Sequence, residues 1–164
     1  MDKKEYGSPE LHIAPMDAFI PLIAESLREG KSVNFKPRGI SMLPMLVQGR
    51  DSVILSPVTG ALKKYDIPLY KRTDGSYILH RIVGVSGDTY TCSGDNQFRK
   101  EQGVKHENVL AVVSAFTRKG KTRSVKSFTY RIYCRFWHYS RPFRRRLSAV
   151  KRRIFCNKHK NKET

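Results

Sequence analysis

Ser41 stands in a short segment with the features of a fixed, exposed loop. The segment reads Gly39-Ile40-Ser41-Met42-Leu43-Pro44. A serine hydroxyl becomes a good nucleophile only when a neighbouring base removes its proton, so it needs exposure and a defined direction. A glycine before the serine and a proline after it predict a sharp turn whose backbone amides can point inward. Taken alone, such a segment is more often an ordinary surface turn between two strands.

His80 and Asp95 could supply the base and a supporting carboxylate. Alternation in the run 77–85 puts His80 on the same strand face as Ile78 and Ile82. Imidazole titrates near neutral pH, and a strand holds it rigidly, so His80 could serve Ser41 as a base. Asp95, in Ser93-Gly94-Asp95-Asn96, could orient the histidine or brace the Ser41 loop. Singly, the histidine is more often a core residue and Gly-Asp-Asn an ordinary turn.

The elements that must position these residues are predicted to be short strands. Alternating or β-branched apolar runs predict strands at 33–35, 52–55, 67–70, 77–85, 89–92 and 109–116. Asp74-Gly75 predicts a tight primed turn between the run ending at Lys71 and the run 77–85. Apolar residues spaced along 19–27 predict one helix from about Pro21 to Glu29, because proline is tolerated in a first turn. The sequence therefore predicts a compact, mainly β domain.

The charge of the chain is concentrated in its last third. Residues 1–116 carry 15 Lys and Arg against 13 Asp and Glu, whereas residues 117–164 carry 17 against 1. We therefore divide the chain into a lead-in with the N-terminal helix (1–30), a catalytic β domain (31–118) and a basic, aromatic-rich tail (119–164). In the tail, the spacing of Phe143, Leu147, Val150 and Ile154 predicts a helix with one apolar face.

The basic tail has three possible environments. Phe136, Trp137, Tyr139, Phe143 and Phe155 interleave with arginines, a composition typical of helices on anionic membrane surfaces, and this is the favoured interpretation. A solvated, partly disordered tail comes next. Nucleic acid is the least favoured partner, although arginine with aromatics also suits phosphates and bases.

The order of the motifs resembles that of the signal peptidase I family, which shares its fold with the self-cleaving SOS-type repressors. The series is Gly39-x-Ser41-Met42-x-Pro44, then Gly49-Arg50-Asp51-Ser52-Val53, Tyr65-Asp66-Ile67, Leu79-His80-Arg81-Ile82 and Gly94-Asp95-Asn96. The resemblance covers roughly residues 31–116, and Ser-Met-x-Pro with His-Arg is its most specific part. It implies a coiled antiparallel β domain of the signal peptidase/SOS-repressor type that cleaves peptide bonds.

The resemblance also implies roles for individual residues. Ser41 falls on the nucleophile, His80 on the base of the histidine branch, and Asp95 on the acidic motif that orients the base or supports the loop. Asp51 and Asp66 match structural positions. The backbone N–H of Ser41 is the expected oxyanion donor, because Gly39 stands where many relatives have a serine that helps to hold the oxyanion. Glu101 is a loose substitute for a further aspartate of the family.

The leading functional hypothesis is a serine endopeptidase that cleaves leader or signal-like peptides through a Ser41–His80 dyad. A histidine base predicts activity that rises through about pH 6–7. The rivals are a self-cleaving or DNA-associated regulator and a catalytically silent binding module that uses the basic tail. No cofactor or metal is expected, because Cys92, Cys134 and Cys156 form no metal-ligand spacing. No signal or membrane-spanning segment is visible, so we expect a cytoplasmic protein, peripheral on the inner face of the membrane if the tail binds lipid.

Overall fold

The computed structural model describes residues 16–147 of the chain. Its elements in chain order are α1 (Met16–Arg28), β1 (Val33–Phe35), β2 (Ser52–Ser56), β3 (Pro68–Lys71), β4 (Tyr77–Leu79), β5 (Arg81–Ser86), β6 (Thr89–Ser93), β7 (Glu101–Lys105), the 3-10 helix η1 (His106–Asn108), β8 (Val109–Arg118), β9 (Lys121–Ser124) and α2 (Phe128–Tyr139). The prediction of a mainly β fold is confirmed.

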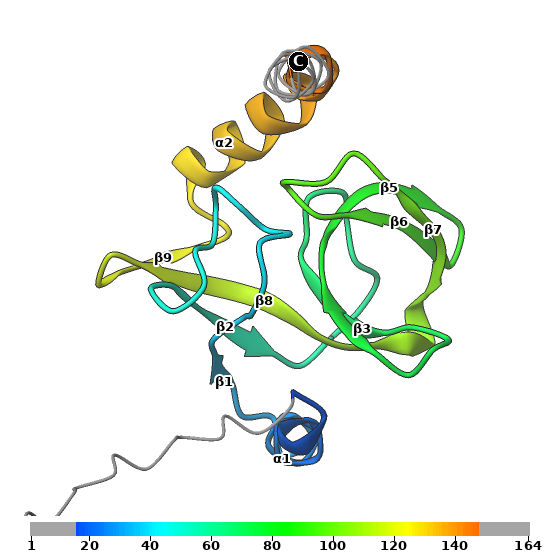
Figure 1. The fold of residues 1–164 in the computed structure, drawn as a ribbon. Coiled ribbons are helices and arrows are strands. Elements are labelled where there is room, and N and C mark those ends of the chain that lie inside the picture. Colours follow the sequence, from blue (N-terminus) through cyan, green and yellow to red (C-terminus); the bar gives the residue numbers. More distant parts are fainter. Residues whose placement is uncertain (1–15, 148–164) are drawn as a thin grey trace, which may run out of the picture.

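The strands form two antiparallel sheets. The larger sheet has the order β1-β2-β8-β3-β4, with β9 also paired to β8, and the smaller one has the order β5-β6-β7. The long strand β8 crosses the molecule and pairs with β2, β3 and β9 along its length (Figure 1). One apolar core lies under the larger sheet and includes Val53, Leu69 and Val113, and a second, including Tyr70 and Ile82, lies against the smaller sheet.

The run 77–85, predicted as one strand, is divided between the two sheets. β4 pairs with β3 in the larger sheet, β5 pairs with β6 in the smaller one, and His80 is the residue between them. The prediction was wrong because alternation persists through the change of sheet: Ile78 and Ile82 both pack against the second core. His80 is therefore held by a strand on each side and lies where the two sheets meet.

The hairpin at Asp74-Gly75 is present, but its loop is longer than predicted. The β3–β4 ladder ends at the pair Lys71 and Tyr77. The Arg72 N–H then donates to the Ser76 carbonyl (2.8 Å), and the Gly75 N–H donates to the Arg72 carbonyl (3.0 Å). Gly75 has a φ of 86°. This is a turn followed by a left-handed residue, which glycine accommodates without strain, in place of a two-residue primed turn.

Helix α1 begins at Met16, earlier than the predicted start near Pro21. Pro21 removes one N–H donor from the helix, yet the apolar side of α1 still packs on the domain. Ile20, Ile23 and Leu27 are all buried in the first core. This burial accounts for the tolerance of a proline inside the helix, because tertiary packing outweighs one lost hydrogen bond.

The segment after residue 118 does not begin as a separate tail. β9 extends the larger sheet, and α2 contributes Tyr130 and Cys134 to the first core. Residues 141–147 are also helical. β7 and β9 were missed because they are short and polar and lack the alternating apolar pattern. The predicted apolar positions Val150, Ile154 and Phe155 lie outside the described residues.

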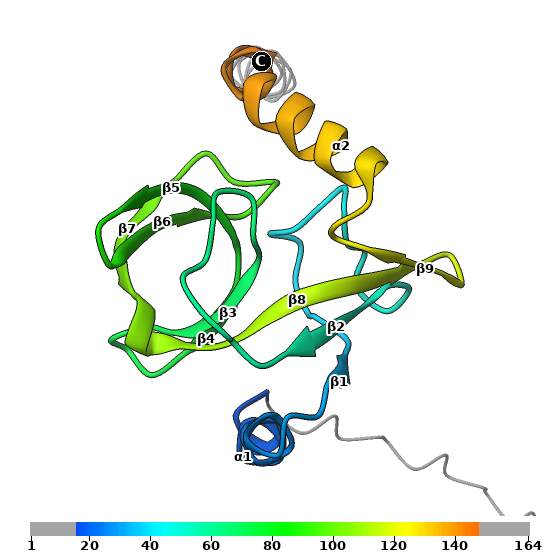
Figure 2. The same cartoon turned by 180° about the vertical axis from the view of Figure 1, so that it is seen from behind.

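Helices α1 and α2 lie at opposite ends of the molecule, with the sheets between them (Figures 1 and 2). Cys92 and Cys134 are free thiols in buried positions, and Cys156 lies outside the described residues. Within residues 16–147, no helix has the length and apolar character needed to cross a bilayer.

Candidate functional site

The Ser41 loop packs directly against the loop that carries Asp95. The Ser41 carbonyl accepts a hydrogen bond from the Asn96 N–H (2.8 Å), and the Ile40 carbonyl accepts one from Asn96 Nδ2 (3.2 Å). A Cβ placed on Gly94 would lie 2.6 Å from the Ser41 carbonyl oxygen and 3.1 Å from the Ser41 Cβ. Glycine at position 94 is therefore required for the two loops to approach this closely.

Ser41 keeps both of its reactive groups free of protein partners. Its side chain is half-buried, and within residues 16–147 neither its Oγ nor its N–H makes a hydrogen bond. The N–H is thus available to a substrate oxygen, as the predicted oxyanion donor must be. Gly39 has a φ of 87°, and its N–H donates to Gln48 Oε1 (2.7 Å). A serine at position 39 would be strained by this backbone, which gives a physical reason for the glycine.

His80 is buried and borders a polar cavity of about 840 Å³ that Arg72, Gln97 and Glu101 also line. Its Nδ1 lies 3.5 Å from the Tyr70 hydroxyl, which itself donates a hydrogen bond to Glu101 Oε2 (2.8 Å). Because the Tyr70 proton points to Glu101, the Tyr70 oxygen can only accept from His80. This arrangement favours the neutral tautomer with the proton on Nδ1 and leaves Nε2 with a free lone pair.

The electrostatic surroundings keep His80 neutral. Burial, and next the Arg72 guanidinium, lower the pKa of His80 to about 4, while the Glu101 and Asp95 carboxylates act in the opposite direction. Burial raises the pKa of Glu101, but hydrogen bonds from Arg72 and Tyr70 together with the nearby positive charge of Arg72 lower this pKa overall. Tyr70 and Arg72 were missed from the sequence. Only the register of β3 against β4, which pairs Tyr70 with Ile78, places them near the histidine.

The ladder of the smaller sheet brings the segments of Ser41 and His80 together. Arg81 pairs with Ser93 at the end of the β5–β6 ladder. His80 and Gly94 are the next residues beyond this pair, one on each strand. Gly94 touches Ser41, and Ser41 lines a small cavity with Leu79, the residue before His80. Within the described residues no hydrogen bond joins Ser41 Oγ to the imidazole. The two segments are thus neighbours, and the dyad contact itself stays a prediction.

Asp95 forms a buried ion pair with Arg81. Arg81 Nε donates to Asp95 Oδ1 (2.8 Å) and Nη2 donates to Oδ2 (2.7 Å), and each side chain is 3% exposed. Arg81 Nη1 also donates to the Tyr65 carbonyl and the Tyr130 hydroxyl. Of the two roles considered for Asp95, this geometry favours bracing the loop, because the carboxylate is bonded to Arg81 and not to His80.

The other two acidic residues of the motif series make local contacts. Asp51 is fully buried, accepts two hydrogen bonds from Arg50 (2.7 and 2.8 Å) and accepts another from the Val47 N–H. Asp66 accepts a hydrogen bond from the Lys63 N–H (2.7 Å). Both contacts tie down turns at a distance from His80 in the chain, in keeping with the structural roles predicted for them.

Helix α2 and the residues after it hold the Asp95 loop from outside. Trp137 Nε1 donates to the Asp95 carbonyl (2.9 Å), and Arg144 Nη1 donates to the same oxygen (3.1 Å). Arg141 Nη2 donates to Ser93 Oγ (2.6 Å) and to the Gln97 carbonyl (2.7 Å). Trp137, predicted as a membrane-facing aromatic, instead packs inward and stacks with Tyr133 and Arg144.

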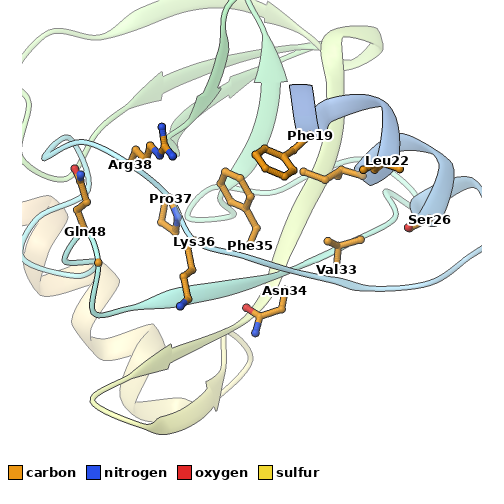
Figure 3. A pocket seen from close by; sticks show the side chains of 12 residues that line it. Phe19, Leu22, Ser26, Val33, Asn34, Phe35, Lys36, Pro37, Arg38 and Gln48 are labelled. Carbon is orange, nitrogen blue, oxygen red and sulfur yellow. The ribbon is translucent and has the colours of Figure 1, made fainter. Parts of the chain in front are cut away.

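An apolar cavity of about 510 Å³ lies between α1 and β1 (Figure 3). Phe19, Leu22, Val33 and Phe35 line it, and the Phe19 and Phe35 rings face one another. It shares four residues, Phe35, Pro37, Arg38 and Gln48, with the small cavity that contains Ser41. The two cavities are therefore adjacent, with these four residues lining both.

Comparisons with models of protein families, with curated proteins and with solved structures found no match to this chain. Within residues 16–147, no group of three or more His, Cys, Asp or Glu side chains is placed to hold a metal ion.

Proposed function

We propose that this chain is a serine endopeptidase of the signal-peptidase-like type, acting on leader or signal-like peptides through Ser41 and His80. The observation that carries the proposal is the contact of Ser41 with Gly94 and Asn96. The β5–β6 ladder ends at the pair Arg81 and Ser93, so this contact brings the chain segment of Ser41 next to the chain segment of His80. The motif order along residues 31–116 is the second support.

The groups present are sufficient for acyl transfer. Ser41 Oγ attacks the scissile carbonyl while His80 Nε2 takes its proton, and the Ser41 N–H stabilises the oxyanion. His80 then returns the proton to the leaving amine. A water molecule attacks the acyl ester, with His80 again accepting the proton, and Ser41 is regenerated. Catalytic hydrogen bonds are often long before substrate binds, so the Ser41–His80 bond is expected to form with the peptide in place.

The apolar cavity beside β1, adjacent to the cavity of Ser41, suits an extended peptide. β1 pairs only with β2 among the described strands, so its other edge offers backbone groups beside the apolar pocket. A peptide added along such an edge gains main-chain hydrogen bonds, while the pocket accepts an apolar side chain. This arrangement supports a peptide substrate with an apolar residue close to the bond that is cut.

The test uses Ser41→Ala, with Ser86→Ala as a matched control on the exposed end of β5. The full-length wild type and both variants are treated with a serine-directed acylating probe and incubated with a peptide library of leader sequences. Mass spectrometry then locates the probe and the cleaved bonds. We expect labelling and cleavage by the wild type and Ser86→Ala, and neither by Ser41→Ala.

Three results would contradict the proposal. Labelling and cleavage that persist in Ser41→Ala would remove the nucleophile assignment. Cleavage of the chain itself, with no cut in any added peptide, would favour the self-cleaving regulator considered above. A wild type that neither labels nor cleaves would favour the silent binding module.

A further inference from the structure

The side of α2 that faces away from the domain carries a row of exposed apolar side chains. We define this outer face as Phe128, Ile132, Phe136 and Tyr139, continued by Phe143 and Leu147. These six side chains are between 43% and 75% exposed. Within α2, the first four are spaced by three or four residues, which places them on one side of the helix. Monomeric proteins rarely leave such a row of large apolar residues in water unless it meets a partner.

The inner face of the same segment is firmly docked, so the outer face is fixed in its outward direction. Tyr130 and Cys134 are buried in the first core, and Trp137 donates to the Asp95 carbonyl. Arg141 and Arg144 continue this inner face with hydrogen bonds to Gln97 and Asp95. The apolar stripe is therefore not an undocked core face, because the core contacts of α2 are already made by other residues.

The surroundings of the stripe carry charge of one sign. Residues 117–147 contain 11 Lys and Arg and no Asp or Glu. Arg131, Arg135, Arg145 and Arg146 are exposed beside the stripe, and no ion pair involves any of the four within the described residues. A surface of this kind complements a ligand that is both apolar and anionic.

We propose that the outer face of α2 binds the surface of an anionic lipid bilayer while its inner face stays docked on the domain. Apolar side chains flanked by arginine match the boundary between acyl chains and negatively charged headgroups. Nucleic acid fits less well, because Ile132 and Leu147 can neither stack on bases nor bind phosphate. A second copy fits less well too, since a symmetric contact would bring the arginines of both copies together without an acidic partner.

The test is flotation of the full-length chain with vesicles of phosphatidylcholine alone or with about one third phosphatidylglycerol. We expect flotation only with the anionic vesicles, weakening as salt rises. Arg131→Gln/Arg135→Gln should lower the partition coefficient roughly 25-fold, about fivefold for each arginine. Ile132→Ser/Phe136→Ser should lower it by about tenfold or more, since both side chains lose apolar burial.

The matched controls remove the same kinds of side chain elsewhere. Val85→Ser is an exposed apolar change on β5, and Lys31→Gln/Lys105→Gln removes two exposed positive charges far from α2 in the chain. We expect both controls to float like the wild type. Because all the replaced side chains are exposed, near-UV circular dichroism should show an intact fold in every variant.

Trp137 gives a second readout, since it is the single tryptophan and lies on the inner face. A spin-labelled lipid should quench Trp137 only slightly when the chain binds vesicles. Strong quenching would mean that α2 leaves the domain to insert, which would overturn the proposed docked orientation.

Three other results would overturn the proposal itself. Flotation that survives Ile132→Ser/Phe136→Ser but is lost in Arg131→Gln/Arg135→Gln would show a purely electrostatic surface. If the Ile132→Ser/Phe136→Ser protein also bound a DNA duplex, the partner would be nucleic acid. Self-association without flotation, lost in Ile132→Ser/Phe136→Ser, would make the stripe a contact between copies. If the wild type neither floated with vesicles nor self-associated, the stripe would not be a lipid-binding surface.

Discussion

His80 and Arg81 are consecutive residues whose surroundings are opposite in kind. Arg81 is surrounded by acceptors on Asp95, Tyr65 and Tyr130, so its charge is fully compensated. His80 has one long contact, to the Tyr70 hydroxyl, and lines a polar cavity. The ion pair with Arg81 fixes Asp95 and with it the Ser93–Asn96 loop, whereas the weakly bonded imidazole beside it keeps a free lone pair. On the proposed function, this lone pair is the one that takes the proton of Ser41.

The largest effect should come from breaking the buried ion pair between Arg81 and Asp95. Arg81→Met leaves the Asp95 carboxylate buried at 3% exposure without its partner. Removing one member of a buried pair costs about 3–5 kcal/mol. Chemical denaturation should therefore show a loss of that size in the free energy of unfolding, and peptide cleavage should fall with it.

The double variant Arg81→Met/Asp95→Leu is the control for this prediction. It removes both charges, so much of the lost stability should return. An Arg81→Met protein as stable as the wild type would show that the ion pair does not hold the loop.

A smaller effect is expected from removing the contact of His80 with the Tyr70 hydroxyl. Tyr70→Phe removes the hydroxyl that accepts from His80 Nδ1 and donates to Glu101, while its ring still fills the core. The neutral imidazole then loses its preferred tautomer, and we expect kcat to fall about tenfold, the order of one lost hydrogen bond. Steady-state cleavage measures the change, and Tyr90→Phe, which alters a tyrosine bonded to Leu62 and His106, is the matched control. Equal kcat in the two variants would contradict the role of Tyr70.

The smallest effect is expected in the pH dependence of kcat/KM, because it should change little near neutral pH. Burial, and then Arg72, lower the pKa of His80 to about 4, so the base is already neutral at pH 6 and the acid limb of kcat/KM should lie near pH 4. Such a limb would lie below the rise through about pH 6–7 that an ordinary histidine predicts. Arg72→Gln should move the limb to higher pH, and NMR titration of the imidazole checks the same shift. A wild-type limb near pH 6.5 would contradict the burial of the base.

The same pKa change has a defined sign for stability. The folded-state pKa of His80 lies below the ordinary value of 6.5, so between these two values the unfolded chain binds more protons. The contribution of the neutral imidazole is complete above about pH 6.5 and is lost as the pH falls toward 4. Activity measurements near pH 4 therefore need a parallel measurement of the folded fraction.

Local pattern was enough to find most strands of the larger sheet. β2 and β8 are rich in apolar, β-branched residues. Asp74-Gly75 marked the hairpin that joins β3 and β4. The same pattern could not show that the run 77–85 changes sheets at His80. Side chains keep alternating through the change, and only the partner strands differ.

The side-chain partners at the site depended on contacts distant in sequence. Asp95 was predicted to orient His80 or to brace the Ser41 loop, and its bond to Arg81 rather than to His80 follows from the β5–β6 register. The inner face of α2 was hidden because Tyr130, Cys134 and Trp137 are interleaved with arginines, which made the segment resemble a solvated tail. Burial of such a face is decided by the domain that it meets.

The separation of α1 from α2 sets a requirement for substrate length. The apolar cavity adjacent to that of Ser41 lies at α1, at the end of the molecule away from α2. A flat bilayer resting on the outer face of α2 would leave this apolar cavity on the aqueous side, separated from the lipid by the β domain. A lipid-tethered peptide would then need an unfolded spacer of matching length, and shortening that spacer should abolish cleavage without touching the cut site.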